Sequence, residues 1–170
     1  MQDKLNRKLT DLRISVTDRC NFRCRYCMPE ELYGEAYEFL KRDQVLSFEE
    51  IVRLTKIFIK LGINKVRLTG GEPLVRKDIE KLVSSISSLD NSIDLAMTTN
   101  GYLLDKFAHI LFDSGLRRLT ISLDSLDNDI FQKMSGKKFD IKDVLAGIGS
   151  AKDAGFEKIK INTVIKKGIN

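Results

Sequence analysis

The chain of 170 residues has no tryptophan, only 2 prolines, a single histidine and no repeat or low-complexity tract. With 42% hydrophobic and 31% charged residues, this composition is typical of a soluble globular protein and argues against disordered and fibrous classes. No apolar run approaches the ~20 residues that cross a bilayer, which argues against a membrane protein. The N-terminal segment Met1–Lys8 lacks an apolar core, so we expect no secretory signal and a cytoplasmic location.

The charge is mildly basic, with 29 Lys and Arg against 24 Asp and Glu, a net charge of +5. Two interpretations remain open: a well-solvated surface with some excess of lysine, or a pocket for an anionic small molecule. The sequence has no clustered basic run with interleaved aromatics, so we expect no nucleic-acid partner.

Cysteine is scarce, and its three copies are close together: Cys20, Cys24 and Cys27, spaced C-x3-C-x2-C. An odd number of thiols in one short loop is no disulfide framework and indicates a metal. Structural zinc takes four ligands, and the single His109 lies far along the chain. Three thiolates suit a four-iron cluster with one open iron that can bind a small molecule. A zinc site with an outside ligand and three reduced structural cysteines are the alternatives.

Short β-branched patterns alternate along the chain with amphipathic ones. The predicted strands are Leu12–Val16, Lys65–Thr69, Ile93–Thr99, Arg118–Leu123 and Lys158–Ile165. The predicted helices are one that begins after Ser47 and ends at Gly62, and then Asp78–Leu89, Leu104–Phe112, Asp127–Met134 and Ile141–Ala154. This alternation favours parallel strands with right-handed crossovers, in either an open doubly wound sheet or part of a barrel. In both, functional residues lie at the carboxyl ends of the strands, and here the unusual residues follow those ends.

The chain stops soon after its fifth predicted strand, whereas an eight-unit barrel takes ~250 residues. We therefore expect the N-terminal part of a longer fold, or a chain that is covered by a partner such as a second copy in a homodimer. Alone, it would expose an edge strand and some apolar surface.

The cysteine loop with Tyr26, together with Gly70–Pro73 after the second predicted strand, resembles the radical S-adenosylmethionine (SAM) superfamily. A larger set resembles the GTP 3′,8-cyclases of molybdenum cofactor biosynthesis: Thr17–Pro29, Val66–Leu74, Thr98–Gly101, Ser122–Leu126 and Lys160–Val164. The resemblance covers about residues 10 to 170. It implies a single radical SAM core domain over residues 1–170, an incomplete TIM-type barrel of parallel strands with outer helices, cut after the fifth strand. The family's C-terminal part, with a second cluster held by three more cysteines, is absent from these residues.

The resemblance also implies cofactors and the residues that bind them. A [4Fe–4S] cluster would be held by Cys20, Cys24 and Cys27, and SAM would bind at the open iron. Contacts to SAM would come from Tyr26, Gly71 and Ser122. The alternative roles are an aromatic that packs the loop for Tyr26, an ordinary tight turn for Gly70 and Gly71, and a strand-end capping hydroxyl for Ser122.

For the substrate, the resemblance assigns GTP contacts to Arg13, Arg67, Thr98 and Lys160. A cation inside a parallel strand that is covered on both faces needs an anionic partner, and arginine binds two phosphate oxygens at once. The alternative for each cation is an internal ion pair, for example with Asp94 or Asp124.

The activity that the resemblance implies is a lyase reaction. A 5′-deoxyadenosyl radical, made from SAM with an electron from a flavodoxin-like or ferredoxin-like donor, converts GTP to 3′,8-cyclo-7,8-dihydro-GTP. A radical SAM enzyme for another substrate, such as a peptide maturase, and a non-catalytic fragment that binds cluster or SAM are the alternatives. We expect the 170-residue chain alone not to complete the cyclisation.

Overall fold

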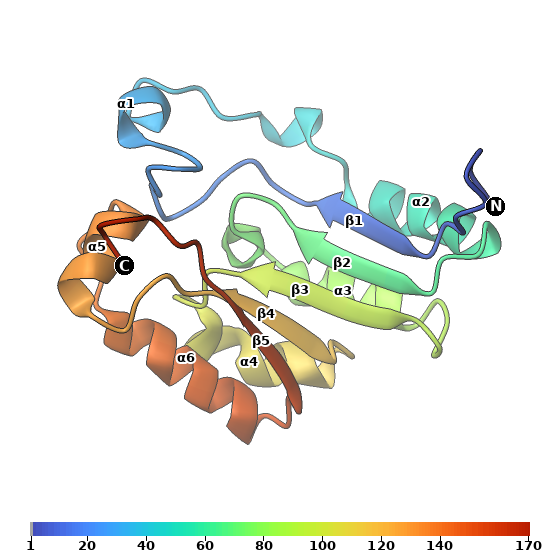
Figure 1. Cartoon of the computed structure of the whole chain (residues 1–170). Coiled ribbons are helices and arrows are strands. Elements are labelled where there is room, and N and C mark those ends of the chain that lie inside the picture. Colours follow the sequence, from blue (N-terminus) through green and yellow to red (C-terminus); the bar gives the residue numbers. More distant parts are fainter. Residues whose placement is uncertain (1) are drawn as a thin grey trace.

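A computed structural model describes residues 2–170, and its centre is one sheet of five parallel strands (Figure 1). The strands are β1 (Asp11–Ser15), β2 (Lys65–Thr69), β3 (Asp94–Thr99), β4 (Arg118–Ser122) and β5 (Lys158–Asn162), and they neighbour one another in sequence order. Sequential order with right-handed crossovers puts every connecting helix on the same face. A doubly wound sheet, with helices on both faces, is therefore excluded, and the partial barrel is confirmed.

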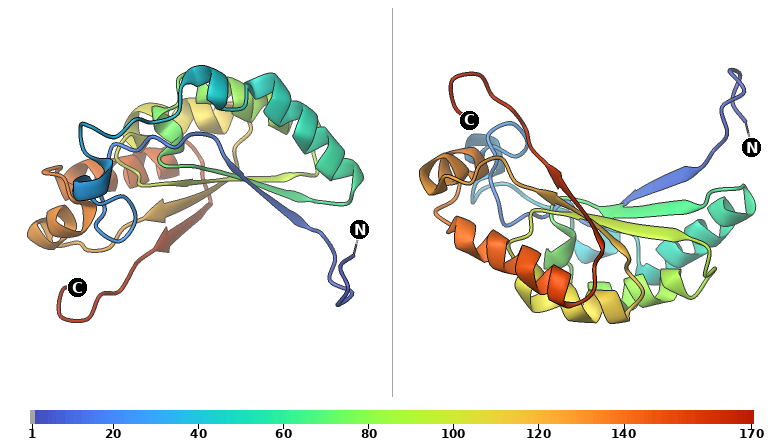
Figure 2. Two further views of the ribbon diagram at one scale, coloured as in Figure 1. Left: turned by 90° about the horizontal axis from the view of Figure 1, so that it is seen from above. Right: turned by 60° about the horizontal axis from the view of Figure 1, so that its bottom comes forward.

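The helices α2 (Phe48–Lys60), α3 (Ile79–Ser87), α4 (Leu104–Asp113) and α6 (Ile141–Asp153) cover that one face. Figure 2 shows the opposite face of the curved sheet without helices. Helix α5 (Asn128–Ser135) lies beyond the carboxyl ends of the strands. The start of α2 has the capping box that its sequence predicts: the Ser47 hydroxyl accepts from Glu50 N at 3.1 Å, and the Glu50 carboxylate accepts from Ser47 N at 2.8 Å.

Three expectations from the sequence need correction. The stretch between the cysteine loop and Gln44 holds two short helical segments, α1 (Glu30–Tyr33) and η1 (Arg42–Gln44), which have too few residues to show a helical period. Strand β5 ends at Asn162 rather than Ile165, because Val164 N donates to the Asp124 carboxylate at 2.9 Å instead of pairing with β4. The helical spacing of Ile51, Phe58 and Leu61 predicts one shared face of this helix, but Leu61 lies at the end of α2 and is 39% exposed.

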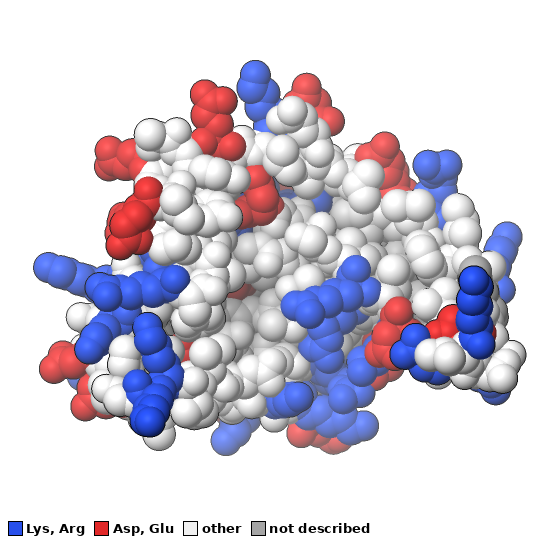
Figure 3. Space-filling view, turned by 45° about the horizontal axis from the view of Figure 1, so that its top comes forward, with Lys and Arg blue, Asp and Glu red and all other residues white. Residues whose placement is uncertain are grey.

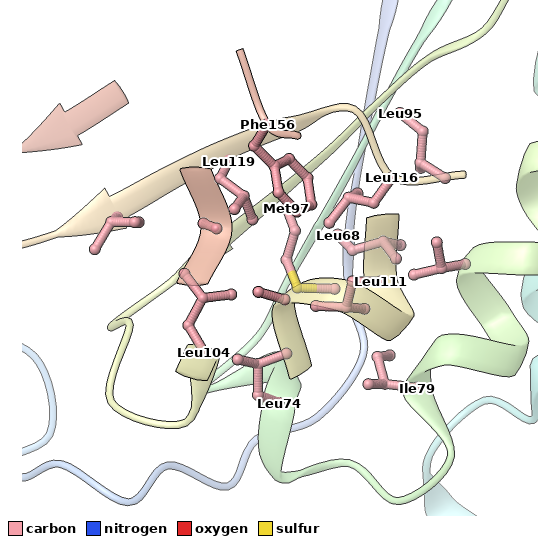
Figure 4. Packing of buried hydrophobic residues seen from close by; sticks show 14 of the residues in the cluster. Leu68, Leu74, Ile79, Leu95, Met97, Leu104, Leu111, Leu116, Leu119 and Phe156 are labelled. Carbon is pink, nitrogen blue, oxygen red and sulfur yellow. The ribbon is translucent and has the colours of Figure 1, made fainter. Parts of the chain in front are cut away.

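The core lies between the sheet and the helices. Alternate strand residues such as Leu68, Met97 and Leu119 point into it, where helix residues such as Leu104 and Leu111 meet them (Figure 4). Because side chains alternate along a strand, the residues between these point to the helix-free face. The fold thereby gives every strand one apolar row for the core and one polar row for the open face.

Both outer strands are edges, since β1 pairs only with β2 and β5 only with β4. Large apolar side chains are exposed on β5 and on the segments that follow β4 and β5, including Leu126 at 72%, Ile161 at 44% and Ile165 at 73%. The expected exposed edge and apolar surface are thus present. Among the described residues, no helix is long and apolar enough to cross a membrane.

Two glycines inside α6 give a matched test of the packing between α4 and α6. A Cβ on Gly147 would lie 2.7 Å from the Gly101 carbonyl oxygen, whereas a Cβ on Gly149 would meet nothing within 4 Å. We expect Gly149→Ala to stabilise the chain by up to about 1 kcal/mol through helix propensity. Gly147→Ala should destabilise it by about 1–3 kcal/mol through overpacking. Urea unfolding followed by circular dichroism measures both, and equal effects of the two substitutions would contradict this packing.

Candidate functional site

The cysteine loop follows β1 at the end of the sheet where the strands finish. Cys27 N and Met28 N both donate to the Cys24 carbonyl oxygen, at 2.9 and 2.8 Å, which folds the second half of the loop into a tight turn. All three thiols are free; those of Cys20 and Cys24 are half-buried, and Cys27 is exposed. The three predicted ligands therefore belong to one ordered loop at the mouth of the half-barrel.

The glycine turn after β2 packs directly on the backbone of this loop. Gly71 N donates to the Thr17 carbonyl oxygen at 2.7 Å, and Glu72 N donates to the Arg19 carbonyl oxygen at 2.8 Å. A Cβ on Gly71 would lie 2.2 Å from that Arg19 oxygen, and one on Gly70 would lie 2.6 Å from the Thr17 oxygen. The glycines are therefore required for close approach to the chain itself, which the tight-turn interpretation alone does not capture.

Helix α5 supports the other side of the cysteine loop. The sequence predicts this helix but not its contact with the loop. Arg23 N donates to the Ser135 carbonyl oxygen at 2.8 Å, and the next residue, Gly136, ends the helix in a left-handed conformation with φ +68°. A Cβ on Gly136 would lie 2.1 Å from the Arg23 carbonyl oxygen. The Arg23 side chain donates to the carbonyl oxygens of Cys20 at 2.7 Å and Tyr33 at 2.8 Å. A glycine after a helical pattern was the available signal for this contact.

The loop's donor chemistry fits an iron–sulfur cluster. Among residues 2–170, no three His, Cys, Asp or Glu side chains converge on a point that could hold one metal ion, as a zinc site requires. Ligands of a four-iron cluster need not converge, because each thiolate binds a different iron. Two buried polar atoms in the loop, Asp18 Oδ1 and Asn21 Nδ2, have no hydrogen-bond partner, as is expected where a further group binds.

The thiols of Cys20 and Cys24 resist ionisation as they stand. Burial raises the pKa of Cys24 to about 12, with a further contribution from the neighbouring Cys20, and burial also raises the pKa of Cys20. A bound metal group would offset this, because its positive charge stabilises the thiolates and releases their protons.

Tyr26 and Ser122, both expected near SAM, lie at the same mouth. The Tyr26 hydroxyl donates to Asp124 Oδ2 at 2.7 Å, so a polar contact anchors a residue that is 47% exposed. Burial, and next this hydrogen bond, raise the pKa of Tyr26. Half-buried Ser122 ends β4, and its hydroxyl makes no hydrogen bond with any described residue, which argues against a capping role.

The four residues expected to contact GTP are brought to the open face of the sheet. Register pairs Arg13 with Arg67 across β1 and β2, Thr98 with Thr120 across β3 and β4, and Thr120 with Lys160 across β4 and β5. Arg67 Nη1 donates to the hydroxyls of Thr98 at 3.1 Å and Thr120 at 2.9 Å. Thr120, which the sequence reasoning did not select, thus helps to orient the guanidinium.

Three cations on this face, Arg13, Arg67 and Lys160, lack the internal ion pairs that the alternative interpretation requires. Asp94 pairs with Arg118 at 2.5 Å, and Asp124 is engaged by Tyr26, so neither neutralises Arg13, Arg67 or Lys160. None of these three forms an ion pair within residues 2–170. Figure 3 shows Lys and Arg side chains gathered over this side of the molecule next to a hollow.

The premise of a sheet covered on both faces is wrong for this chain, because helices cover only one face. Arg13 and Lys160 are therefore exposed and solvated, and Arg67 is half-buried. The uncompensated positive charge remains and attracts an anion.

Glu72 connects the glycine turn to the end of β3. Its carboxylate, 1% exposed, accepts hydrogen bonds from Leu74 N at 3.0 Å, the Thr99 hydroxyl at 2.8 Å and Asn100 N at 2.7 Å. Burial raises the pKa of Glu72 to about 7, although these donors oppose the shift. The sequence reasoning gave this residue only a part in the turn.

The position of the cysteine loop defines the class: a parallel half-barrel protein that carries its cysteines at the mouth formed by the strand ends. The family model described as Radical SAM superfamily matches residues 14–170. The chain belongs to the radical SAM superfamily.

Relatives and solved structures agree with that assignment. The chain is 49% identical to a GTP 3′,8-cyclase of Staphylococcus haemolyticus and 52% identical to one of Acidothermus cellulolyticus, over all 170 residues. It spans about half the length of these relatives, 50% and 47% respectively. The fold is similar to methylornithine synthase (PylB), with a TM-score of 0.72, 16% identity, and coverage of 96% of this chain and 46% of that one. It is also similar to Streptococcus suis SuiB bound to S-adenosylmethionine, with a TM-score of 0.73, 23% identity, and coverage of 94% and 33%.

The raised pKa of Glu72 predicts a pH dependence of stability. The unfolded carboxyl ionises near 4.5 and the folded one near 7, so the folded state holds its proton more tightly between these values. This contribution to stability is full below pH 4.5 and is lost as the pH rises through 7, by up to about 3 kcal/mol. The free energy of unfolding, measured by urea titration at several pH values, should therefore fall less over this window in Glu72→Gln than in the native chain. The same dependence of the free energy of unfolding on pH in both chains would contradict a raised pKa of Glu72.

Proposed function

We propose that the chain is the core part of a GTP 3′,8-cyclase, in which one loop holds a [4Fe–4S] cluster and the open sheet face binds GTP. The observation that carries the proposal is the pairing of two features on one sheet. Three thiols lie at its strand ends, and Arg67 is oriented by two hydroxyls without a carboxylate partner on its open face.

The cysteines Cys20, Cys24 and Cys27 would hold the cluster, which when bound supplies the electron that cleaves SAM to methionine and a 5′-deoxyadenosyl radical. Tyr26, Gly71 and Ser122 would bind and orient SAM beside it. The unpaired hydroxyl of Ser122 and the polar anchor of Tyr26 on Asp124 support these roles. The protein's own contribution is to bring the reacting groups together and exclude water.

The open face would bind the triphosphate of GTP. Arg67 presents a planar fork to phosphate oxygens, while Arg13 and Lys160 add charge from β1 and β5, the two edge strands of the sheet. Thr98 accepts a hydrogen bond from the Arg67 guanidinium and lies in register with Thr120 and Lys160. A peptide substrate offers no matching concentration of negative charge, so the charge distribution favours the nucleotide.

The share of this chain in the reaction follows from its extent. It spans about half the length of the cyclases that it resembles. We assign to it the cluster, SAM and part of the GTP site, with a flavodoxin-like or ferredoxin-like protein as the electron donor.

Cluster binding is tested by anaerobic reconstitution with iron and sulfide. We expect about four irons per chain and charge-transfer absorption, and reduction in the presence of SAM should give 5′-deoxyadenosine. Cys24→Ala should lose both, because two thiolates cannot hold the cluster with one iron open. The exposed serine variant Ser92→Ala is the control and should retain both. A folded native chain that takes up no cluster would refute the proposal.

GTP binding is tested separately by calorimetry at low ionic strength. We expect Arg67→Ala and Lys160→Ala each to weaken GTP about tenfold or more, since each loses a charge-assisted contact. The affinity for guanosine, which lacks phosphates, should be the same in these two variants as in the native chain. Arg53→Ala and Lys142→Ala remove exposed cations from the helices and should leave GTP affinity nearly unchanged. Equal losses in all four variants, or equal affinity for GTP and guanosine, would contradict the site.

A further inference from the structure

The side chain of Asn100 reaches the cysteine loop from the end of β3, 80 residues further along the chain. Its amide nitrogen Nδ2 donates to Cys20 Sγ at 3.9 Å and to Asn21 Oδ1 at 2.8 Å. Asn100 is half-buried, so solvent does not simply replace these contacts.

The orientation of this amide is fixed from two sides. Asn100 Oδ1 accepts from Tyr102 N at 3.1 Å, which turns the NH₂ group toward the loop. The backbone Asn100 N donates to the buried Glu72 carboxylate at 2.7 Å, which holds the residue at the strand end. The donor is thereby in place before any cofactor binds.

The three cysteine sulfurs differ in their hydrogen bonds. Cys20 Sγ accepts from Phe22 N at 3.4 Å as well as from Asn100. Within residues 2–170, neither Cys24 nor Cys27 has an N–H donor on its sulfur. One corner of a bound cluster would therefore be distinguished from the other two.

An N–H bond to a ligating thiolate affects redox chemistry as well as geometry. Reduction of a cluster by one electron increases the negative charge on its sulfur ligands, and an N–H donor stabilises that charge. Hydrogen bonds to the sulfurs are among the factors that set the reduction potential of iron–sulfur clusters. A donor on Cys20 should therefore make reduction easier.

We propose that Asn100 is a positioning residue that orients the Cys20 thiolate and, through its side-chain N–H, raises the reduction potential of the cluster. This inference rests on the proposed function, because it requires Cys20 to be a cluster ligand. It adds a role for the end of β3 that is separate from contact with SAM or GTP.

The test compares Asn100→Leu, which is neutral and of similar size, and Asn100→Asp with the matched surface variants Asn91→Leu and Asn91→Asp. Each chain is reconstituted with iron and sulfide, and the reduced cluster is counted by electron paramagnetic resonance during a mediated titration with dithionite. At one applied potential, we expect the ratio of reduced to oxidised cluster to fall about tenfold in Asn100→Leu, equivalent to ~59 mV for one electron. Both Asn91 variants should match the native chain.

A second measurement uses the native chain labelled with ¹⁵N in the side-chain amide of asparagine. Pulsed electron paramagnetic resonance of the reduced cluster should detect a coupled ¹⁵N that disappears in Asn100→Leu and persists in Asn91→Leu. No such coupling in the native chain, or an unchanged potential in both Asn100 variants at native iron content, would overturn the inference. Absence of a cluster from the native chain would instead refute the proposed function. If Asn100→Leu fails to load iron, Asn100→Asp and the labelled native chain decide the matter.

Discussion

The arrangement of the mouth depends on two main-chain hydrogen bonds between segments 50 residues apart, from Gly71 N to the Thr17 carbonyl and from Glu72 N to the Arg19 carbonyl. They continue the contact between β1 and β2 beyond the end of the sheet and are made at distances that only glycine allows at position 71. Because the turn is held there, the Glu72 carboxylate points inward and fixes the end of β3. The cysteine loop is thus assembled by backbone contacts, and a cofactor would bind to a loop that is already shaped.

Much of this organisation could be predicted from the sequence. The alternation of periods gave five strands and the helices between them, and the cysteine spacing indicated the metal loop. The order of the strands could not be predicted from hydrophobic periodicity, because an open doubly wound sheet and a barrel have the same local patterns. The end of β5 was missed because Thr163–Ile165 are all β-branched residues, which are typical of strands, while the Asp124 carboxylate that interrupts the ladder lies 40 residues away. The supporting roles of Arg23 and Asn100 are tertiary contacts that no local pattern encodes, whereas for Gly136 the local pattern indicates the helix end but not the contact with Arg23.

The open face of the sheet corrects one premise of the sequence interpretation. The family resemblance assigns GTP contacts to Arg13, Arg67 and Lys160, and a sheet covered on both faces would in addition bury their charges. The sheet is covered on one face only, and the charges are partly solvated. What sets them apart is that the nearby carboxylates are already engaged: Asp94 binds Arg118, and Asp124 binds Tyr26. An anion that reached this face would meet uncompensated charge rather than buried charge.

The contact between Gly136 and the Arg23 carbonyl ties the length of α5 to the cysteine spacing. One residue added to or removed from this helix would turn Gly136 by about 100° around the helix axis and replace it against Arg23 with a side chain. The turn at Asp90–Ser92 lies at the opposite end of the sheet, where an insertion reaches none of the cysteines. Over evolutionary time, this architecture restricts length changes at one end of the half-barrel and leaves the other end free to vary.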